Sequence, residues 1–225
     1  EFDEALGAIQ NIQIALRDVY RIALDVGIER FPDTWGTLSP RLLTVATWVA
    51  YDLDGRSDIS WDVSLRTRFE VAKWQLDNYL KRWKVVGANL DDASVQDFGT
   101  KLGAIRQAFD DMLSGFEGDL SDVKSAQHLG LQLQVSHDRK PCDIQPLIES
   151  LDLLLGKVSE RSALVELKIF RAELVNFGFG FAHTHVRLNA TQLHNAIQRY
   201  LQIDGSPDEP GNRRRFMNAL TDLFD

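Results

Sequence analysis

The chain has little cysteine and no long apolar run. Cys142 is the only cysteine among 225 residues, which excludes an intramolecular disulfide and leaves a cysteine-based zinc site without its partner ligands. A reducing, cytoplasmic setting is therefore expected. The longest mostly apolar stretch covers residues 42–51, about half of the roughly 20 residues that a membrane span requires, and no signal-peptide pattern opens the chain. We expect no membrane span.

Positive charge is also scarce. The 25 Lys and Arg residues against 33 Asp and Glu give a net charge of −8 and a pI near 5.1. The one basic run, Arg213–Arg215, follows a Gly/Pro loop and is more simply a solvated helix start than a phosphate-binding patch. A nucleic-acid partner is thus not expected. The five tryptophans show no spacing typical of a stacking platform and are interpreted as core and interface residues.

Apolar periodicity predicts a mainly α protein of about seven helices and two short strands. The expected helices span about 5–26, 60–86, 94–114, 144–156, 162–176, 189–201 and 213–224. Gly27 is expected to stop the first helix, and Ser60, Ser94 with Asp97, and Asn189 are expected to cap others. The apolar stripe of the first helix is predicted to be Leu6, Ile9, Ile12, Leu16, Val19, Ala23 and Val26. Residues 129–135 fit no single state.

The two expected strands lie far apart in the sequence. Residues 45–51 form a short apolar, β-branched run, and residues 179–186 alternate with period two. Two such strands cannot make an independent sheet core, so they either lie among the helices or complete a sheet supplied by other sequence. Because the chain opens on Glu1 with a helical pattern already running, we interpret residues 1–225 as a single helical domain or a fragment of a longer protein.

The densest polar group is His183, His185 and Arg187, on one face of the second strand. Imidazoles two residues apart can share a metal ion, and Glu149 is a candidate third ligand. The alternative is that both histidines hydrogen-bond neighbouring helices. A second polar group, Asp52 and Asp54, follows the first strand.

The carboxylates of that second group suit either a cation, an arginine partner or simple turn formation. The sequence contains no Gly-rich phosphate loop, nucleophile elbow or zinc-protease motif.

Three segments together resemble the phosphoenolpyruvate carboxylase family. Residues 47–56, Thr-Trp-Val-Ala-Tyr-Asp-Leu-Asp-Gly-Arg, resemble the family's Trp-Met-Gly-Gly-Asp-Arg-Asp-Gly-Asn-Pro stretch, and residues 146–150 resemble its Glu-Pro-Leu-Glu helix. The third segment is Phe177-Gly178 followed by His185-Val186-Arg187 and His194, and it resembles the family's Phe-Gly, Asp-Ile-Arg-Gln and Arg-His pattern. The positions that carry the first and third segments are Trp48, Asp52, Asp54, Gly55, Phe177, Gly178, His185, Arg187 and His194.

The resemblance implies a fold and an activity. The family is a largely helical enzyme around an eight-stranded β/α barrel, several times longer than this chain, in which residues 45–52 and 179–188 would be two barrel strands. It converts phosphoenolpyruvate and bicarbonate to oxaloacetate and phosphate, a carbon-fixing lyase reaction that feeds the tricarboxylic acid cycle, with Mg²⁺ or Mn²⁺ as cofactor. Its members are commonly tetramers, which implies a homo-oligomer.

The site that the resemblance implies is incomplete when the family's site residues are matched one by one to this sequence. The family's phosphate-binding arginine falls on Leu53, and Arg56 would have to replace it. Of the two metal-binding carboxylates, one falls on Glu149 and the other on His185, a pair that suits a transition metal better than magnesium. The family's His-Pro-Thr motif and its Gly- and Arg-rich loop are not among these residues.

Three functions therefore compete. The first is an internal segment of a divergent phosphoenolpyruvate carboxylase, inactive as this chain alone. The second is a non-catalytic helical scaffold or partner-binding homologue, which Leu53 favours. The third is a transition-metal site on Glu149, His183 and His185 with altered chemistry.

Overall fold

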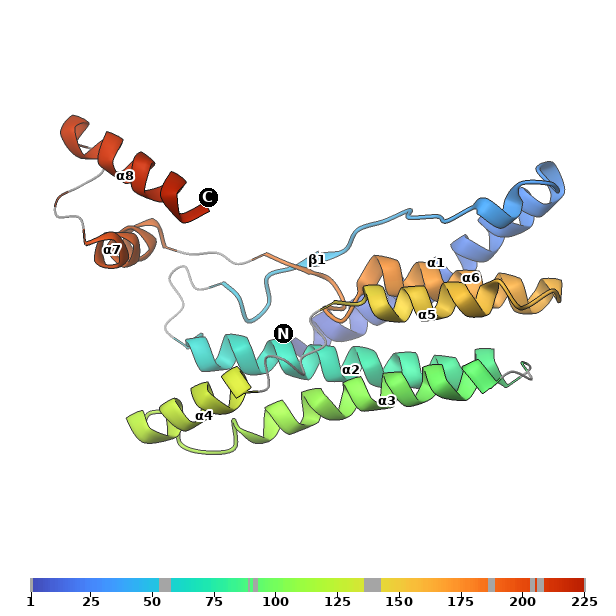
Figure 1. The fold of residues 1–225 in the computed structure, drawn as a ribbon, viewed down its shortest axis with the longest axis horizontal. Helices are drawn as coiled ribbons and strands as arrows, with labels where there is room; N and C mark the ends of the chain where they lie inside the picture. The colour runs from blue at the N-terminus through green and yellow to red at the C-terminus, as the bar shows by residue number, and fades with distance from the viewer. Residues whose placement is uncertain are drawn as a thin grey trace.

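The computed structural model describes residues 2–52, 58–88, 90, 93–135, 143–185, 189–202, 205 and 209–224, and these are mainly helical. They form eight α-helices, one 3₁₀ turn and two short strands (Figure 1). In chain order the elements are α1 (Phe2–Arg30), η1 (Trp35–Thr37), β1 (Ala46–Thr47), α2 (Trp61–Gly87), α3 (Ala93–Ser114), α4 (Val123–Val135), α5 (Gln145–Leu155), α6 (Arg161–Phe177), β2 (His183–Thr184), α7 (Ala190–Leu201) and α8 (Pro210–Phe224). The predicted helical class is confirmed. The additional helix is α4, which covers the residues that the sequence left undecided.

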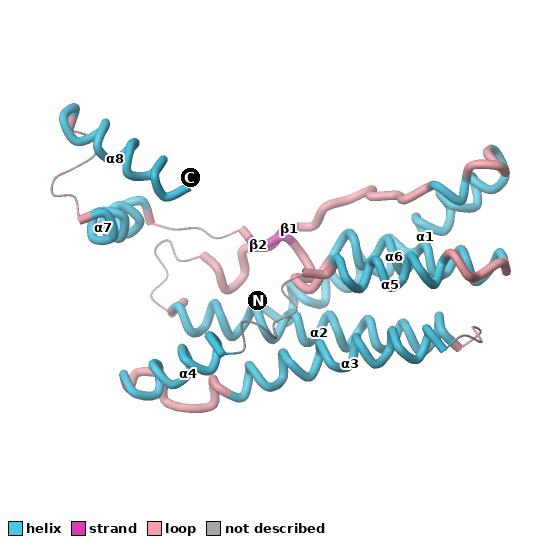
Figure 2. The backbone as a smooth tube through the Cα atoms, viewed as in Figure 1, coloured by secondary structure: helices cyan, strands magenta, loops and turns pink. Residues whose placement is uncertain are grey.

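The main core lies between α2, α3, α5 and α6. The long helices α2 and α3 run side by side as a hairpin, and α5 and α6 pack on them (Figures 1 and 2). At the centre, Phe98 stacks on Trp83 with ring centroids 4.4 Å apart, and both rings contact Phe170. Each fully buried side chain of this size contributes about 1.5–3 kcal/mol of transfer free energy, so this cluster is a major source of stability. On α3 the apolar side chains of Phe98, Leu102, Phe109 and Met112 are buried.

The predicted apolar face of α1 is confirmed only in part, because Ile9 and Leu16 are buried but other members of the predicted stripe are exposed. Val19 and Val26 are 45% and 49% exposed, whereas Tyr20 and Leu24 are fully buried. The helix carries two apolar stripes, and the one containing Tyr20 packs on α6. On the buried stripe, Gln13 is tolerated because its amide donates to Gln75 on α2 at 3.0 Å. The predicted stripe therefore mixed residues of the buried stripe, Ile9 and Leu16, with residues that face solvent.

One predicted helix end is wrong, and one helix begins where predicted but without the predicted capping hydrogen bond. Gly27 does not stop α1, which continues to Arg30, because Gly27 provides room for Leu38: a Cβ here would lie 2.4 Å from the Leu38 Cδ1 atom. Ser60 precedes α2, but its hydroxyl donates to the Asp62 side chain and makes no capping hydrogen bond.

A further predicted cap is wrong and one is confirmed. Ser94 lies inside α3, where its hydroxyl accepts from Lys157 at 2.7 Å, so it is no cap. Before α7, the Thr191 amide donates to the Asn189 side chain at 2.9 Å, which confirms that cap.

The two strands pair with each other in parallel, with Ala46 opposite His183 and Thr47 opposite Thr184. The His183 amide donates to the Val45 carbonyl and the His185 amide to the Thr47 carbonyl, both at 2.8 Å. Each strand is shorter than predicted, because only two residues of each find a partner within the described chain.

The last two helices stand apart from the bundle (Figures 1 and 2). They contact one another through His194 of α7 and Phe216 of α8, whose ring centroids are 5.7 Å apart. Several of their apolar side chains face solvent, including Leu193, Tyr200 and Met217. None of the helices in the described part of the chain combines the length and the apolar character needed to cross a membrane.

Candidate functional site

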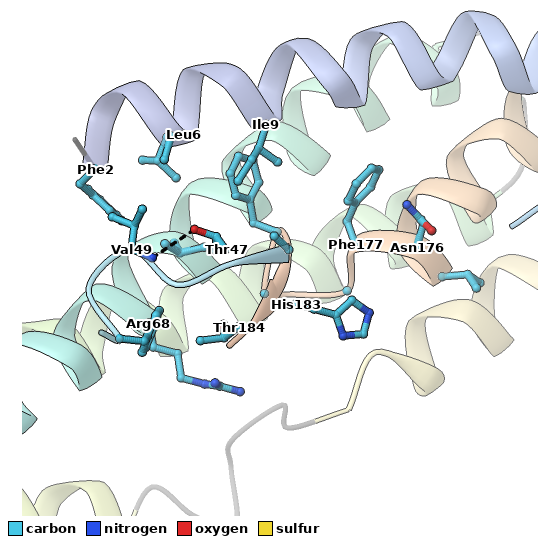
Figure 3. A pocket seen from close by; sticks show the side chains of 18 of the residues that line it. Phe2, Leu6, Ile9, Thr47, Val49, Arg68, Asn176, Phe177, His183 and Thr184 are labelled. Atoms are coloured by element: carbon cyan, nitrogen blue, oxygen red, sulfur yellow. Dashed lines mark hydrogen bonds between the residues drawn. The ribbon is translucent and has the colours of Figure 1, made fainter. Parts of the chain in front are cut away.

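A cavity of about 380 Å³ lies beside the strand pair. Figure 3 shows Phe2, Leu6 and Ile9 of α1 on one side of it and Arg68, His183 and Thr184 on the other. Most of the remaining lining comes from β1 and the residues on either side of it, including Arg41, and from the end of α6 with the glycine-containing turn that follows. The cavity therefore draws together the chain around residue 48 and the chain around residue 180, which are remote in sequence.

The polar lining of this cavity is cationic or neutral. Arg41, Arg68 and His183 contribute basic groups, and the part of the chain that the structure describes places no Asp or Glu side chain in the lining. Neither arginine has an ion-pair partner among the described residues. Both arginines are exposed, and in a protein of net charge −8 a cavity lined by two arginines is suited to an anionic ligand, because guanidinium binds carboxylate and phosphate in bidentate geometry.

Asn176 is the most unusual residue of the lining. It is 7% exposed, and neither its amide nitrogen nor its amide oxygen has a hydrogen-bond partner within the described chain. Leaving a buried polar group unsatisfied costs about 1–3 kcal/mol. A ligand with both an acceptor and a donor would satisfy this side chain.

The hydroxyl groups near the cavity remain neutral donors. Burial raises the pKa of Tyr51, whose hydroxyl hydrogen-bonds the Thr184 side chain. Burial likewise raises the pKa of Tyr79, which donates to the Gly178 carbonyl at 2.9 Å. These hydroxyls can therefore orient a ligand or a backbone segment but cannot supply a base.

The backbone beside the cavity is held in sparsely populated conformations. Gly178 ends α6 at φ 53° and ψ −145°, and the non-glycine residues Ala50 and Phe181 have φ values of 67° and 64°. Phe181 is held there by burial against Trp74, with ring centroids 4.5 Å apart. Strain of this kind, about 1–3 kcal/mol per residue, persists where the surroundings enforce it and is concentrated at functional sites.

A partly buried ion-pair cluster, which we call the clamp, lies one to three turns before Asn176 on α6. It consists of Arg17 and Arg21 of α1, Arg82 of α2, and Glu166 and Glu173 of α6. The Arg17 guanidinium hydrogen-bonds Glu173, which is 2% exposed, and Arg82 donates to Glu166 at 2.5 Å. The clamp joins the three helices that surround the cavity.

The two carboxyl groups of the clamp are shifted in opposite directions. Burial raises the pKa of Glu173, although Arg17 and Arg82 oppose this effect. Burial would also raise the pKa of Glu166, but hydrogen bonds from Arg21 and Arg82 lower it overall. Sequence reasoning missed the clamp; its signal is the four-residue spacing of Arg17 and Arg21 on one helix and the seven-residue spacing of Glu166 and Glu173 on another.

The predicted metal ligands are not brought together. Glu149 is exposed on α5, where it accepts a 3.5 Å contact from Gln145, while His183 and His185 are exposed at β2. Across the described ranges no three His, Cys, Asp or Glu side chains lie close enough to hold a metal ion. His183 instead lines the cavity.

The positions that carry the family resemblance are placed as follows. Trp48 is 55% exposed just after β1, and Asp52 is partly buried. Phe177 and Gly178 line the cavity, and His194 lies on α7, away from it. Leu53, Asp54, Gly55, Arg56, Arg187 and Cys142 lie outside the described residues.

Sequence reasoning missed the residues that give the cavity its character. Arg41, Arg68 and Asn176 belong to no motif, and Arg68 looks like an ordinary solvated helix residue. The available signal was the position of Asn176, directly before the Phe177-Gly178 pair.

No protein-family model, curated protein or solved structure matches this chain.

Proposed function

We propose that this chain is a segment of a phosphoenolpyruvate carboxylase-like protein, and that it contributes an anion-binding cavity but does not complete the reaction alone. The observation that carries the proposal is the parallel pairing of β1 and β2 beside the cavity. These strands belong to the two segments that carry the resemblance, and neighbouring barrel strands are parallel in a β/α barrel.

The chemistry of the cavity supports a small anion as ligand. Phosphoenolpyruvate carries a phosphate and a carboxylate, and Arg41 and Arg68 offer one guanidinium to each. Asn176 can donate to one ligand oxygen, and the hydroxyl groups of the lining can orient another. These residues bind and orient; none of them is placed to transfer a proton.

The described residues do not fit the Mg²⁺ or Mn²⁺ that the resemblance implies. These ions prefer oxygen ligands in octahedral geometry, whereas the matching positions offer an exposed Glu149 and the imidazole of His185. A transition metal suits imidazole better, but Glu149, His183 and His185 do not converge on one point. We therefore assign no step of the reaction to a metal ion.

Binding is tested directly on this chain by calorimetric titration with phosphoenolpyruvate. Arg68→Gln should weaken binding at least tenfold. Arg66→Gln is the matched control, because Arg66 lies on the same helix, pairs with Glu70 at 2.9 Å and does not line the cavity. Equal binding by both variants, or no binding by the parent chain, would contradict the proposal.

Turnover is tested on the intact natural protein. Oxaloacetate formation from phosphoenolpyruvate and bicarbonate is coupled to malate dehydrogenase, first with magnesium and then with manganese. Metal-dependent turnover would show that a diverged site still works in the intact protein, and Arg56→Gln should then reduce it.

The second candidate function is a non-catalytic scaffold or partner-binding homologue. It is favoured by Leu53 at the position of the family's phosphate-binding arginine and by the dispersed metal-ligand positions. No turnover by the folded intact protein with either metal, together with retained phosphoenolpyruvate binding, would select it.

A further inference from the structure

The solvent side of α1 carries a regular apolar row. Its positions alternate at spacings of four and three residues, which is the heptad repeat of helix pairs. The row consists of Ala8, Ile12, Ala15, Val19, Ile22 and Val26, and all six residues are exposed. We call it the α1 seam.

The α1 seam is distinct from the packed face of the same helix. Ile12, Val19 and Ile22 are 36%, 45% and 61% exposed, whereas Leu16 and Tyr20 between them are buried against α6. An amphipathic surface helix needs only one apolar stripe, so a second stripe with four β-branched residues costs solubility without stabilising this fold. The seam covers 19 residues, about 27 Å of helix at 1.5 Å per residue, which is long enough for a helical partner.

The edge of the α1 seam is acidic. Asp18 and Asp25 occupy the heptad positions directly before Val19 and Val26, and both are exposed. Neither has an ion-pair partner in the part of the chain that the structure describes. In helix pairs these flanking positions face the partner and select it by charge.

Charge disfavours a second copy of this chain as the occupant. In an antiparallel pair of α1 helices, Asp18 and Asp25 would face the same acidic edge of the other copy. In a parallel pair Asp18 would face Ala23 and Asp25 would face Arg30, so only one of the two acidic side chains would gain a basic partner. Each copy also has a net charge of −8, which adds a repulsion between copies.

We propose that the α1 seam binds an amphipathic helix of a partner protein that has an apolar heptad row flanked by Lys or Arg. The alanines at positions 8 and 15 let the two helix backbones approach closely, while Ile12, Val19 and Ile22 pack into the partner's row. Asp18 and Asp25 pair with the basic flank. This interaction is independent of the cavity and of phosphoenolpyruvate.

The test uses two labelled synthetic peptides of three heptads, with the same apolar row and with either Lys or Glu at the flanking positions. Fluorescence anisotropy with the 225-residue chain should show that the Lys peptide binds at least tenfold more tightly than the Glu peptide. Raising the salt concentration should reduce this difference. In the variant Asp18→Lys/Asp25→Lys the preference should reverse.

A matched pair of substitutions locates the binding surface. Ile22→Asn should weaken binding of the Lys peptide at least tenfold. Ile14→Asn should not, because Ile14 is 48% exposed on the same helix but lies off the seam. Both side chains are exposed, so both variants should keep the circular dichroism and the melting temperature of the parent chain.

Several results would overturn the proposal. Equal binding of the two peptides, or no binding, would exclude charge-selected helix docking. Equal losses in Ile22→Asn and Ile14→Asn would place the peptide elsewhere. Concentration-dependent dimerisation that Ile22→Asn abolishes would make a second copy the occupant, and binding to this chain but not to the intact natural protein would show that the protein covers the seam itself.

Discussion

The clamp should be unusually sensitive to loss of one arginine. Arg17→Met keeps most of the apolar stem but removes the guanidinium that hydrogen-bonds Glu173, a carboxylate only 2% exposed. Arg82 remains, with its Nε atom 3.8 Å from Glu173. Breaking a buried pair on one side costs about 3–5 kcal/mol, and because Arg82 still faces the carboxylate we expect the lower end, about 3 kcal/mol.

A second substitution separates the buried charge from lost packing. Glu173→Gln in the Arg17→Met background replaces the stranded carboxylate with a neutral amide, so the double variant should recover about 2 kcal/mol. Arg66→Met is the matched control. Its partner Glu70 is 2.9 Å away, but the side chains are 58% and 38% exposed, so a loss of only about 0.5 kcal/mol is expected. Urea denaturation followed by circular dichroism measures the free energies of unfolding of the parent chain, the double variant and the three single variants, Glu173→Gln included.

The pH dependence gives an independent check. Because burial raises the pKa of Glu173, the folded chain binds more protons than the unfolded chain between the ordinary carboxyl pKa and the raised one. The contribution of Glu173 to stability therefore falls as pH rises through that window. Removing Arg17 raises the pKa of Glu173 further, so the loss of stability in Arg17→Met should be smaller at about pH 4.5 than at about pH 7.5. An equal deficit at both pH values, or a double variant as unstable as the sum of its single substitutions, would refute the reasoning.

Two further substitutions test the cavity wall. Asn176→Leu is nearly isosteric and removes two unsatisfied buried atoms, so it should raise the free energy of unfolding by about 1 kcal/mol in chemical denaturation. The same variant should bind phosphoenolpyruvate more weakly. A loss of stability would mean that this amide is satisfied in solution. Gly178→Ala should lower the free energy of unfolding by about 1–3 kcal/mol because Gly178 has a φ of 53°. Gly7→Ala is the control: Gly7 lies inside α1 with no atom within 4 Å of the new Cβ, so this substitution should raise the free energy of unfolding by up to about 1 kcal/mol.

The helices could be predicted from the sequence because their signals are local. The stripe of α3, containing Phe98 and Phe109, and the cap at Asn189 depend only on residues within a turn or two of each other. The face of α1 could not be predicted in this way. Both of its stripes are apolar, and the choice between them is made by α6, which accepts Tyr20 and Leu24.

The cavity could not be predicted from local sequence signals either, because its residues come from distant parts of the chain. Arg68 and Asn176 are more than a hundred residues apart and acquire a shared environment only through tertiary structure, in which α2 packs on α6 and β1 pairs with β2. The predicted ligands Glu149 and His185 were each assigned by pattern, and pattern carries no information about their separation. The parallel strand pair joins two of the segments that carry the sequence resemblance and lies beside the cavity.

Tyr79 links the clamp to the cavity, which allows their connection to be tested. Its hydroxyl donates to the Gly178 carbonyl at 2.9 Å and lies 3.3 Å from the carbonyl of Glu173, so it ties the end of α6 to the turn that lines the cavity. Tyr79→Phe removes this hydrogen bond and keeps the ring that packs on Phe170, so a stability loss of about 1 kcal/mol is expected.

If the turn is positioned by this hydroxyl, Tyr79→Phe should also weaken phosphoenolpyruvate binding several-fold in calorimetry, although Tyr79 does not line the cavity. If the loss of stability occurs without any loss of affinity, the turn must be held by the burial of Phe177 and Phe181 instead. In that case the clamp supports only the bundle, and Arg17→Met should leave binding unchanged wherever the chain remains folded.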